Sequence, residues 1–138
     1  MQTFIGTKVV EAETEERDGV LGYKVVYPDG YVSWSPPEAF EEAYRLSGEM
    51  NFGHALELLK RGHKVARAGW NGKGMFLYYV AAASYPAARN PKGTMIGVFP
   101  DDMVPYQAYI AMKTAQDTVV PWLCSQTDAL AEDWCVVA

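Results

Sequence analysis

The first 50 residues alternate between short apolar runs and turn-forming residues. β-Branched and aromatic side chains concentrate at 7–13, 23–27 and 31–34, and this pattern predicts three strands. Pro-Asp-Gly at 28–30 is a turn signal between the last two runs. We therefore expect the chain to begin with a small antiparallel sheet.

A helix should follow this sheet and complete a β-β-β-α unit. Ser35 fits the N-cap, Pro36 fits the first turn, where its missing N–H costs nothing, and Glu38 completes a capping box. Apolar residues then recur at helical spacing and predict one buried stripe: Phe40, Ala43 and Tyr44. The helix should end near Ser47-Gly48, so residues 1–48 are the first predicted domain.

The second predicted domain, residues 49–138, begins with another helix. Asn51 fits its N-cap, and Gly62 fits its end. One helical face follows the N-cap at i, i+3, i+4 and i+7: Phe52, Ala55, Leu56 and Leu59. A short strand at 64–67 then leads into a glycine-rich segment at 69–74.

The remaining residues indicate short strands and one long connection. The strands are predicted at 75–80, 106–112, 119–123 and 134–137. Residues 81–104 are predicted to be a long loop, and Ser125 begins a second capping box. Short strands with hairpin-like links favour an α+β fold, in which a mainly antiparallel sheet with two main helices follows the small β-β-β-α unit.

Composition and charge exclude several classes of protein. No apolar run among the 138 residues approaches the length of about 20 that spans a bilayer, so no membrane partner is expected. Residues 1–50 carry ten Asp and Glu against four Lys and Arg, whereas 51–138 carry seven against eight. Without a basic stripe, long nucleic acid is not an expected partner. The start of the chain lacks the regions of a signal peptide, so we expect a cytoplasmic protein.

The residue pattern gives little support to metal binding or catalysis. The candidate metal ligands form no CxxC or HxxxH pair: His54, His63, Cys124 and Cys135. No Gly-x-Ser-x-Gly elbow surrounds Ser125. The carboxylates available for acid–base chemistry lie beside a capped helix, where a structural role is more common: Asp128, Glu132 and Asp133. We expect no metal, no cofactor and no catalytic residue.

The segment GWNGKG at 69–74 is the first candidate for ligand binding. It precedes a predicted strand rather than a helix, so it is not a dinucleotide fingerprint, and its glycines alone would suit a hairpin turn. Trp70 and Asn71 favour a binding role, because an indole offers a stacking face and an amide pairs with a base edge or ribose. Trp122 also combines an aromatic face with small polar neighbours, whereas Trp134 begins an alternating strand and should fill the core.

Four segments of the second domain resemble one protein family. They are MNFGHAL at 50–56, KVARAGWNGKGM at 64–75, IAMKTA at 110–115 and VPWLCSQTDALAEDW at 120–134. In combination, the GWNGKG and PW-x-x-SQTD-x-x-x-x-DW motifs are specific, and they resemble the second family of Thoeris anti-defence proteins of phages and prophages. The resemblance covers residues 50–138, and the acidic residues 1–48 form an extension that shorter family members lack.

The resemblance implies a protein that sequesters a cyclic nucleotide immune signal in the cytoplasm of an infected bacterial host. Members of the family capture a glycocyclic ADP-ribose made by a TIR-domain enzyme, and some also hold cyclic dinucleotides. They form homotetramers with ligand pockets at subunit interfaces, so the expected partners are a small cyclic nucleotide and further copies of this chain. The protein is expected not to be an enzyme, because tight binding with slow release is sufficient to keep the signal from its effector.

The matching motif positions also imply roles for single residues. The expected stacking faces are Trp70 and Trp122. The expected hydrogen-bonding partners of ribose hydroxyls or base edges are Asn71, Ser125 and Asp128. The pyrophosphate would be met by Arg67 or Lys113, since such an anion needs a charge-assisted contact. Phe52 would wall the pocket, although its place on a helical stripe also explains it as a core residue.

Two alternative functions remain open from the sequence. An enzyme that degrades the same signal would leave hydrolysed product after exposure to the protein. A protein-interaction module that inhibits a host defence protein through its acidic N-terminal part would show a protein partner and no stabilisation by a small molecule.

Overall fold

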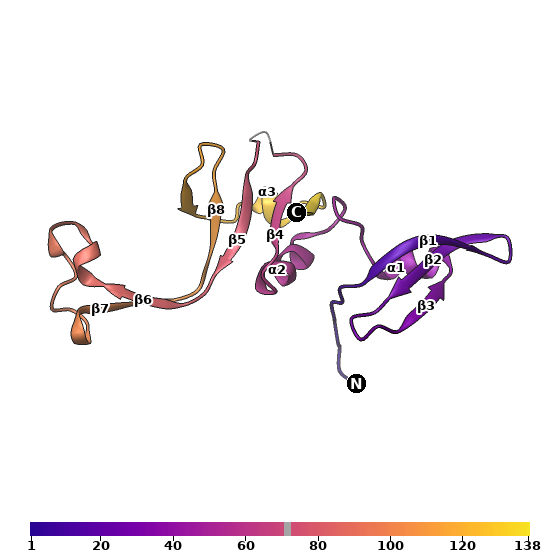
Figure 1. The fold of residues 1–138 in the computed structure, drawn as a ribbon, viewed down its shortest axis with the longest axis horizontal. Coiled ribbons are helices and arrows are strands. Elements are labelled where there is room, and N and C mark those ends of the chain that lie inside the picture. The colour runs from indigo at the N-terminus through magenta and orange to yellow at the C-terminus, as the bar shows by residue number, and fades with distance from the viewer. Residues whose placement is uncertain (71–72) are drawn as a thin grey trace.

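The computed structural model describes residues 1–70 and 73–138, and it contains three antiparallel sheets with helices beside them (Figure 1). The strand orders are β1-β2-β3, β10-β4-β5-β8-β9 and β6-β7. The predicted α+β class, mainly antiparallel with two main helices, is confirmed. In the part of the chain that the structure describes, no helix is long and apolar enough to cross a membrane.

The N-terminal unit has the predicted β-β-β-α order with shifted bounds. Its elements are β1 (Glu11–Arg17), β2 (Val20–Val26), β3 (Val32–Ser35) and α1 (Pro37–Ala43). The predicted strand at 7–13 is wrong in its first half, because the β1–β2 hairpin is centred further along the chain. Asp18 and Gly19, with φ of 52° and 79°, form its two-residue turn. An Asp-Gly pair is a strong hairpin signal because both central residues need positive φ.

The predicted capping box at the start of α1 is also wrong. The N-cap is Pro36, and the Ser35 hydroxyl donates to the Pro36 carbonyl at 3.2 Å instead of capping the helix. Pro37 forces the preceding residue into extended backbone, so the helix begins one residue later than a serine cap would require. The predicted buried stripe forms only in part: the ring of Phe40 stacks on Tyr23 and Tyr44 at centroid distances of 4.2 and 4.9 Å, but Ala43 is exposed and no residue of α1 is fully buried.

The second part of the chain folds around the five-stranded sheet. Its elements are α2 (Phe52–Lys60), β4 (Lys64–Arg67), β5 (Phe76–Val80), β8 (Tyr109–Lys113), β9 (Val119–Pro121), α3 (Gln126–Ala129) and β10 (Trp134–Val137). Helix α2 packs against β4, β5 and β10 and buries one core cluster: Met50, Ala55, Leu58, Leu59, Val65, Leu77 and Trp134. Burying each larger side chain contributes about 1.5–3 kcal/mol, so this cluster is the main source of stability in the second part.

Asn51 caps α2 as predicted, and His54 completes the cap. Asn51 Oδ1 accepts a hydrogen bond from the His54 backbone N–H at 3.0 Å, and the Asn51 backbone N–H donates to His54 Nδ1 at 3.2 Å. Two donors at the start of the helix are therefore satisfied by one reciprocal pair, with an imidazole where Glu or Gln is usual.

The predicted long loop at 81–104 is wrong, because it contains two further strands. Strands β5 and β8 lead into β6 (Ala83–Pro86) and β7 (Met103–Tyr106), which pair with each other and project away from the five-stranded sheet (Figure 1). Three 3-10 turns close this arm, defined here as residues 83–106: η1 (Ala87–Arg89), η2 (Pro91–Gly93) and η3 (Pro100–Asp102). Pro86 and Pro105 argue against strands in a sheet interior, but a two-stranded ribbon has free edges that tolerate proline.

Candidate functional site

Three aromatic rings surround the fully buried side chain of Trp134. The ring centroids of Phe52, Trp70 and Trp122 lie 5.3, 5.6 and 6.2 Å from the Trp134 indole, and the Trp70 and Trp122 contacts are edge-to-face. Phe52 and Trp122 also contact each other at 5.8 Å. The rings come from the start of α2, the segment after β4 and the segment after β9, so the fold brings together residues from three distant parts of the sequence.

The three outer rings are only partly buried, in contrast to Trp134 with 0% exposure. Their inner edges pack on the core, and part of each ring remains accessible to solvent. The Trp134 indole N–H donates to the Asp128 carbonyl at 3.1 Å, which satisfies the polar atom that burial would otherwise leave without a partner. The result is a group of half-exposed aromatic faces held by one buried tryptophan.

Arg67 lies between two carboxylates next to this aromatic group. Its Nε donates to Asp133 Oδ1 at 2.8 Å, and its Nη1 donates to Asp128 Oδ1 at 2.9 Å. Nη2 makes a longer contact with Asp133 Oδ2 at 3.5 Å. One guanidinium therefore links β4 to α3 and to the residue before β10, and the trio carries a net charge of −1.

The pKa of each member of the trio is shifted in the direction that favours its charged form. The guanidinium beside Asp133 has the largest effect on that carboxyl and holds its pKa below the usual range. For Asp128, burial raises the pKa, but hydrogen bonding from Arg67, Ser125 and the Trp70 indole outweighs burial, and the net shift is downward. Hydrogen bonds to Asp133 and then Asp128 raise the pKa of Arg67.

The segment that carries Trp70 is attached at both described ends. Before it, the Gly69 backbone N–H donates to Asp133 Oδ2 at 3.0 Å. After it, Lys113 Nζ donates to the Gly74 carbonyl at 3.2 Å and pairs with Asp117 at 2.6 Å. Gly74 has a φ of 72°, a conformation that favours glycine.

Ser125 has the capping role that its sequence context predicts. Its hydroxyl oxygen accepts a hydrogen bond from the Asp128 backbone N–H at 3.0 Å at the start of α3. The neighbouring thiol of Cys124 has a raised pKa, chiefly because of partial burial and secondly because of Asp128. A thiol of this kind is mostly protonated near neutral pH and is a weak nucleophile.

The predicted site residues fall into three groups. The structure gathers five of them in one region: Phe52, Arg67, Trp70, Trp122 and Asp128. Ser125 joins them through its bond to Asp128, while Lys113 is held to the far end of the glycine-rich segment. Asn71 lies outside the described residues. The binding roles of all eight stay predictions.

Asp133 is the residue whose part in this region the sequence argument missed. Sequence neighbours suggest only a carboxylate for acid–base chemistry, yet Asp133 contacts Arg67 and the Gly69 amide. These contacts follow from the antiparallel pairing of β10 with β4, which places Trp134 opposite Arg67 and which spacing in the sequence does not reveal. The predicted core position of Trp134 is confirmed.

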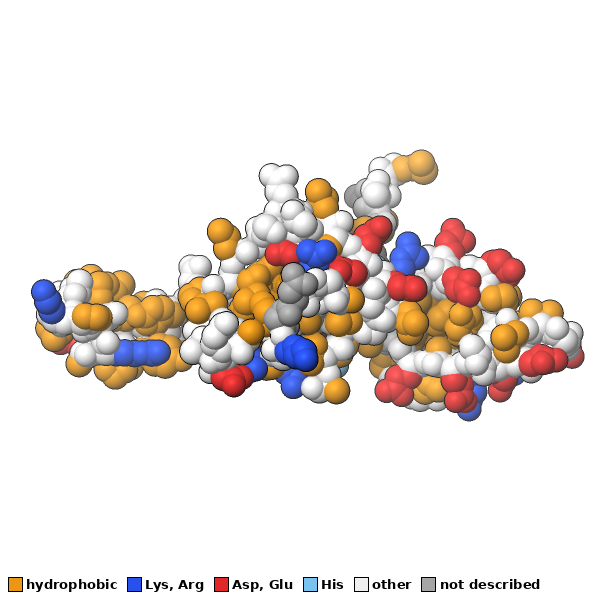
Figure 2. Space-filling model, turned by 90° about the horizontal axis from the view of Figure 1, so that it is seen from above, with side chains coloured by type: hydrophobic (Ala, Val, Ile, Leu, Met, Phe, Trp, Pro, Cys, Tyr) orange, Lys and Arg blue, Asp and Glu red, His pale blue; other side chains and the backbone are white. Residues whose placement is uncertain are grey.

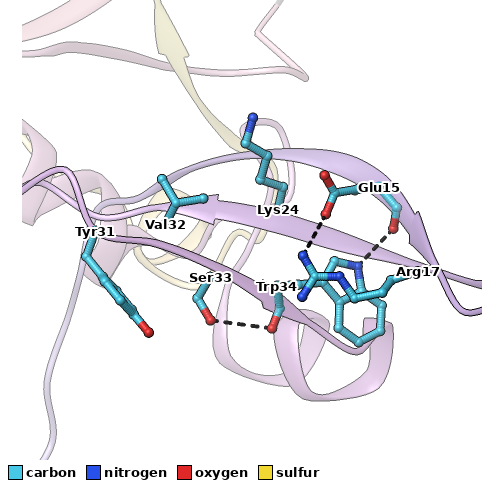
Figure 3. Close-up of a pocket in the computed structure, with 7 residues that line it drawn as sticks. All are labelled: Glu15, Arg17, Lys24, Tyr31, Val32, Ser33 and Trp34. Atoms are coloured by element: carbon cyan, nitrogen blue, oxygen red, sulfur yellow. Dashed lines mark hydrogen bonds and ion pairs between the residues drawn. The ribbon is translucent and has the colours of Figure 1, made fainter.

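A separate open pocket of about 330 Å³ lies on the N-terminal sheet (Figure 3). Its walls are Glu15, Arg17, Lys24, Tyr31, Val32, Ser33 and Trp34. The Arg17 guanidinium pairs with Glu15 at 3.4 Å and lies 5.6 Å from the centre of the Trp34 ring. Lys24 pairs with Glu13 at 3.2 Å, so both cations of this pocket already have acidic partners.

The comparisons with known proteins concern the part of the chain that holds the aromatic group. The family model described as the Thoeris anti-defense 2-like domain matches residues 50–137. The chain is also similar to a protein of Bacillus phage SP01 named Thoeris anti-defense 2, with 43% identity over 93 residues, which are 67% of this chain and 100% of that protein. Because the match covers most of the chain and all of that relative, this protein belongs to the Thoeris anti-defense 2 family.

Proposed function

We propose that this protein counteracts Thoeris immunity by binding the glycocyclic ADP-ribose signal and withholding it, intact, from its effector. The observation that carries the proposal is the group of half-exposed rings around Trp134, with Asp128 and Ser125 beside it. The same residues lie in the segment that matches the family, whose sequenced relative from Bacillus phage SP01 is named for anti-defence.

The aromatic group suits a nucleotide because bases and nucleoside rings stack on exposed π faces. Each base–aromatic contact contributes about 1–3 kcal/mol, so two such faces support tight binding. Trp70 and Trp122 are held against Trp134 by edge-to-face contacts, which leaves their rings positioned before a ligand arrives. Such preorganisation favours affinity because little side-chain freedom is lost on binding.

Two cations near the aromatic group are already paired within one chain. Arg67 faces two carboxylates, and Lys113 is paired with Asp117. For either cation to meet a pyrophosphate, the ligand must displace or share these partners. We therefore propose that further cations come from a second copy of the chain. Two exposed candidates, Arg89 and Lys92, lie at the end of the projecting arm.

The arm and the rim of the aromatic group support such an assembly. Figure 2 shows apolar side chains gathered along the arm, at the left of the view. The exposed apolar residues of the arm are Tyr85, Ile96, Val98, Met103 and Tyr106. Leu123, next to Trp122, and Leu130, just after α3, are 90% and 79% exposed. An isolated two-stranded ribbon is at best marginally stable in water, so contact with further copies would stabilise it. We propose a homo-oligomer, a tetramer as in the resembling family.

The geometry favours binding over cleavage of the signal. A general base works best with a pKa near the operating pH, but Asp128 and Asp133 have lowered pKa values and are paired with Arg67. The Ser125 oxygen caps α3, and the Cys124 thiol has a raised pKa. These features leave both potential nucleophiles without an activating base, which is why we propose a binding protein rather than an enzyme.

Calorimetric titration with glycocyclic ADP-ribose tests the stacking role. Trp70→Ala should weaken binding by about tenfold or more, since loss of one stacking face removes about 1–3 kcal/mol. Tyr31→Ala is the matched control, because Tyr31 is an exposed aromatic residue of the N-terminal unit and its loss should leave affinity unchanged. Equal affinity of the parent and a folded Trp70→Ala protein would contradict the proposed site.

Light scattering tests the assembly. The parent should have a mass above that of one 15.3 kDa chain, and Tyr106→Arg on the arm should lower it. A monomeric parent would contradict the proposed homo-oligomer without excluding ligand binding by one chain.

A further inference from the structure

Asp133 joins two segments that are more than 60 residues apart in the sequence. One carboxylate oxygen binds Arg67 Nε at 2.8 Å, and the other binds the Gly69 backbone N–H at 3.0 Å. The Asp133 backbone carbonyl also accepts a hydrogen bond from the Ala68 N–H at 3.0 Å. These contacts lie immediately before Trp70 on one segment and immediately before Trp134 on the other. Asp133 therefore holds the segments of Trp70 and Trp134 together through an ion pair and hydrogen bonds, in addition to the contact between the two rings.

Gly69 is shaped to admit this carboxylate. A Cβ atom at position 69 would lie 3.0 Å from Asp133 Oδ2, closer than ordinary van der Waals contact. Gly69 has no positive φ, so backbone conformation does not require glycine here. The close approach of the Asp133 side chain gives the first glycine of GWNGKG a packing role, because a Cβ atom at position 69 would make the carboxylate shift by a few tenths of an ångström.

Both oxygens of Asp133 are occupied within the chain, in contrast to the half-exposed ring faces of Trp70 and Trp122. A ligand that contacted Asp133 directly would share oxygens that already accept hydrogen bonds from Arg67 and Gly69. We therefore assign the main effect of Asp133 to the segment that it holds.

We propose that Asp133 is a positioning residue of the ligand site, which fixes the Trp70 segment against the Trp134 strand through Arg67 and the Gly69 amide. This inference rests on the proposed function, because it assigns Asp133 to the site at which the signal would bind. In this assignment, Arg67 acts mainly as the bridge between Asp133 and Asp128.

The experiment compares variants of the full chain in titrations with glycocyclic ADP-ribose. Asp133→Asn removes the charge that holds Arg67, and Gly69→Ala displaces the carboxylate without changing charge. Each should weaken binding by about tenfold, the size of a coupling between contacting residues. Glu132→Gln is the matched control, since this neighbouring carboxylate is exposed and its loss of charge should change affinity less than about twofold.

Two further measurements separate positioning from general destabilisation. Leu58→Ala removes a buried side chain of the same core, so it should lower the melting temperature while leaving the affinity of the folded protein unchanged. The double variant Gly69→Ala/Asp133→Asn should bind no more weakly than the weaker single variant, because both changes break the same contact.

The outcomes are distinct for the inference and for the proposed function. Weak binding by Asp133→Asn and by Gly69→Ala, with normal binding by the two controls, would support the positioning role. Parent-like affinity in both variants would overturn it while leaving the proposed function in place, and additive losses in the double variant would also overturn it. A parent protein that does not bind the signal would overturn the proposed function and this inference together.

Discussion

The N-terminal unit and the family domain both place a tryptophan over a sheet, and they stabilise it in different ways. In the N-terminal unit, Trp34 lies over Gly22, and its indole N–H donates to the Glu15 carbonyl at 3.0 Å. In the family domain, Trp134 is fully buried under three other aromatic rings. Trp34 is held by one hairpin and its neighbour, whereas Trp134 is held by rings from three distant segments of its domain.

The ion pairs of the two regions also differ in how far they reach along the sequence. Acidic side chains lie over the N-terminal unit, at the right of Figure 2, and its ion pairs Lys24–Glu13 and Arg17–Glu15 are local to one sheet. The Arg67 trio joins segments more than 60 residues apart. The pairs of the N-terminal unit thus lie within one strand or join neighbouring strands, whereas the trio joins distant segments beside the aromatic group. Four changes test this comparison.

Trp134→Ala should have the largest effect. It removes a side chain with no exposure and leaves three rings without support, so we expect a loss of about 3–5 kcal/mol in the free energy of unfolding. Urea unfolding followed by circular dichroism measures the loss. A change below about 1 kcal/mol would show that the aromatic group does not stabilise the domain.

Gly22→Ala should have the next largest effect, confined to the N-terminal unit. The added Cβ would lie 2.5 Å from Trp34 Cζ2 and against the Ser35 carbonyl, so the ring must move. Overpacking of this kind costs about 1–3 kcal/mol. Hydrogen exchange should show faster exchange in β1–β3 and unchanged protection in the five-stranded sheet. Equal loss of protection in both regions would contradict the expectation that the effect is confined to the N-terminal unit.

Acid should weaken the family domain through the Arg67 trio. The folded pKa values of Asp128 and Asp133 lie below their unfolded value of about 3.9, so the unfolded state binds more protons in acid. The stabilisation is thus complete at neutral pH and is lost as pH falls below about 4. We expect a loss on the order of 1 kcal/mol, because both side chains are partly exposed. Arg67→Gln should flatten this dependence in thermal melts, and an unchanged slope would contradict the assignment.

Glu13→Gln should have the smallest effect. Glu13 is largely exposed in its pair with Lys24, and exposed pairs contribute about 0.2–1 kcal/mol at most. Thermal melts should differ from the parent by less than about 2 °C. A loss as large as the roughly 1 kcal/mol expected for the Arg67 trio would remove the contrast between local and long-range pairs.

Much of the fold could be predicted from local chemistry. The cap of α2 at Asn51, the strand at 64–67 and the buried Trp134 follow from hydrophobic spacing and capping residues, and the structure confirms them. The arm could not be predicted in this way. Its strands contain Pro86 and Pro105, and proline in a sequence argues against a central strand. These prolines are tolerated because both strands of the ribbon are edge strands.

The site was predictable in composition but not in contacts. Trp70 and Trp122 can be predicted as candidate stacking faces, because small polar residues lie next to them in the sequence. Which carboxylate holds Arg67 depends on the register of β10 against β4, and register is a tertiary property that spacing does not reveal. For that reason the contact between Asp133 and Arg67 cannot be predicted from the residues next to Asp133 in the sequence.

The most direct test of the central claim is capture and release of the signal. The purified parent protein is mixed with glycocyclic ADP-ribose, separated from free ligand and heated, and the released molecule is identified by mass spectrometry. Our account predicts recovery of the intact cyclic nucleotide in amounts that follow the protein concentration, and little recovery from Trp70→Ala. Linear or hydrolysed product from the parent would show an enzyme and contradict the claim that the protein only withholds the signal.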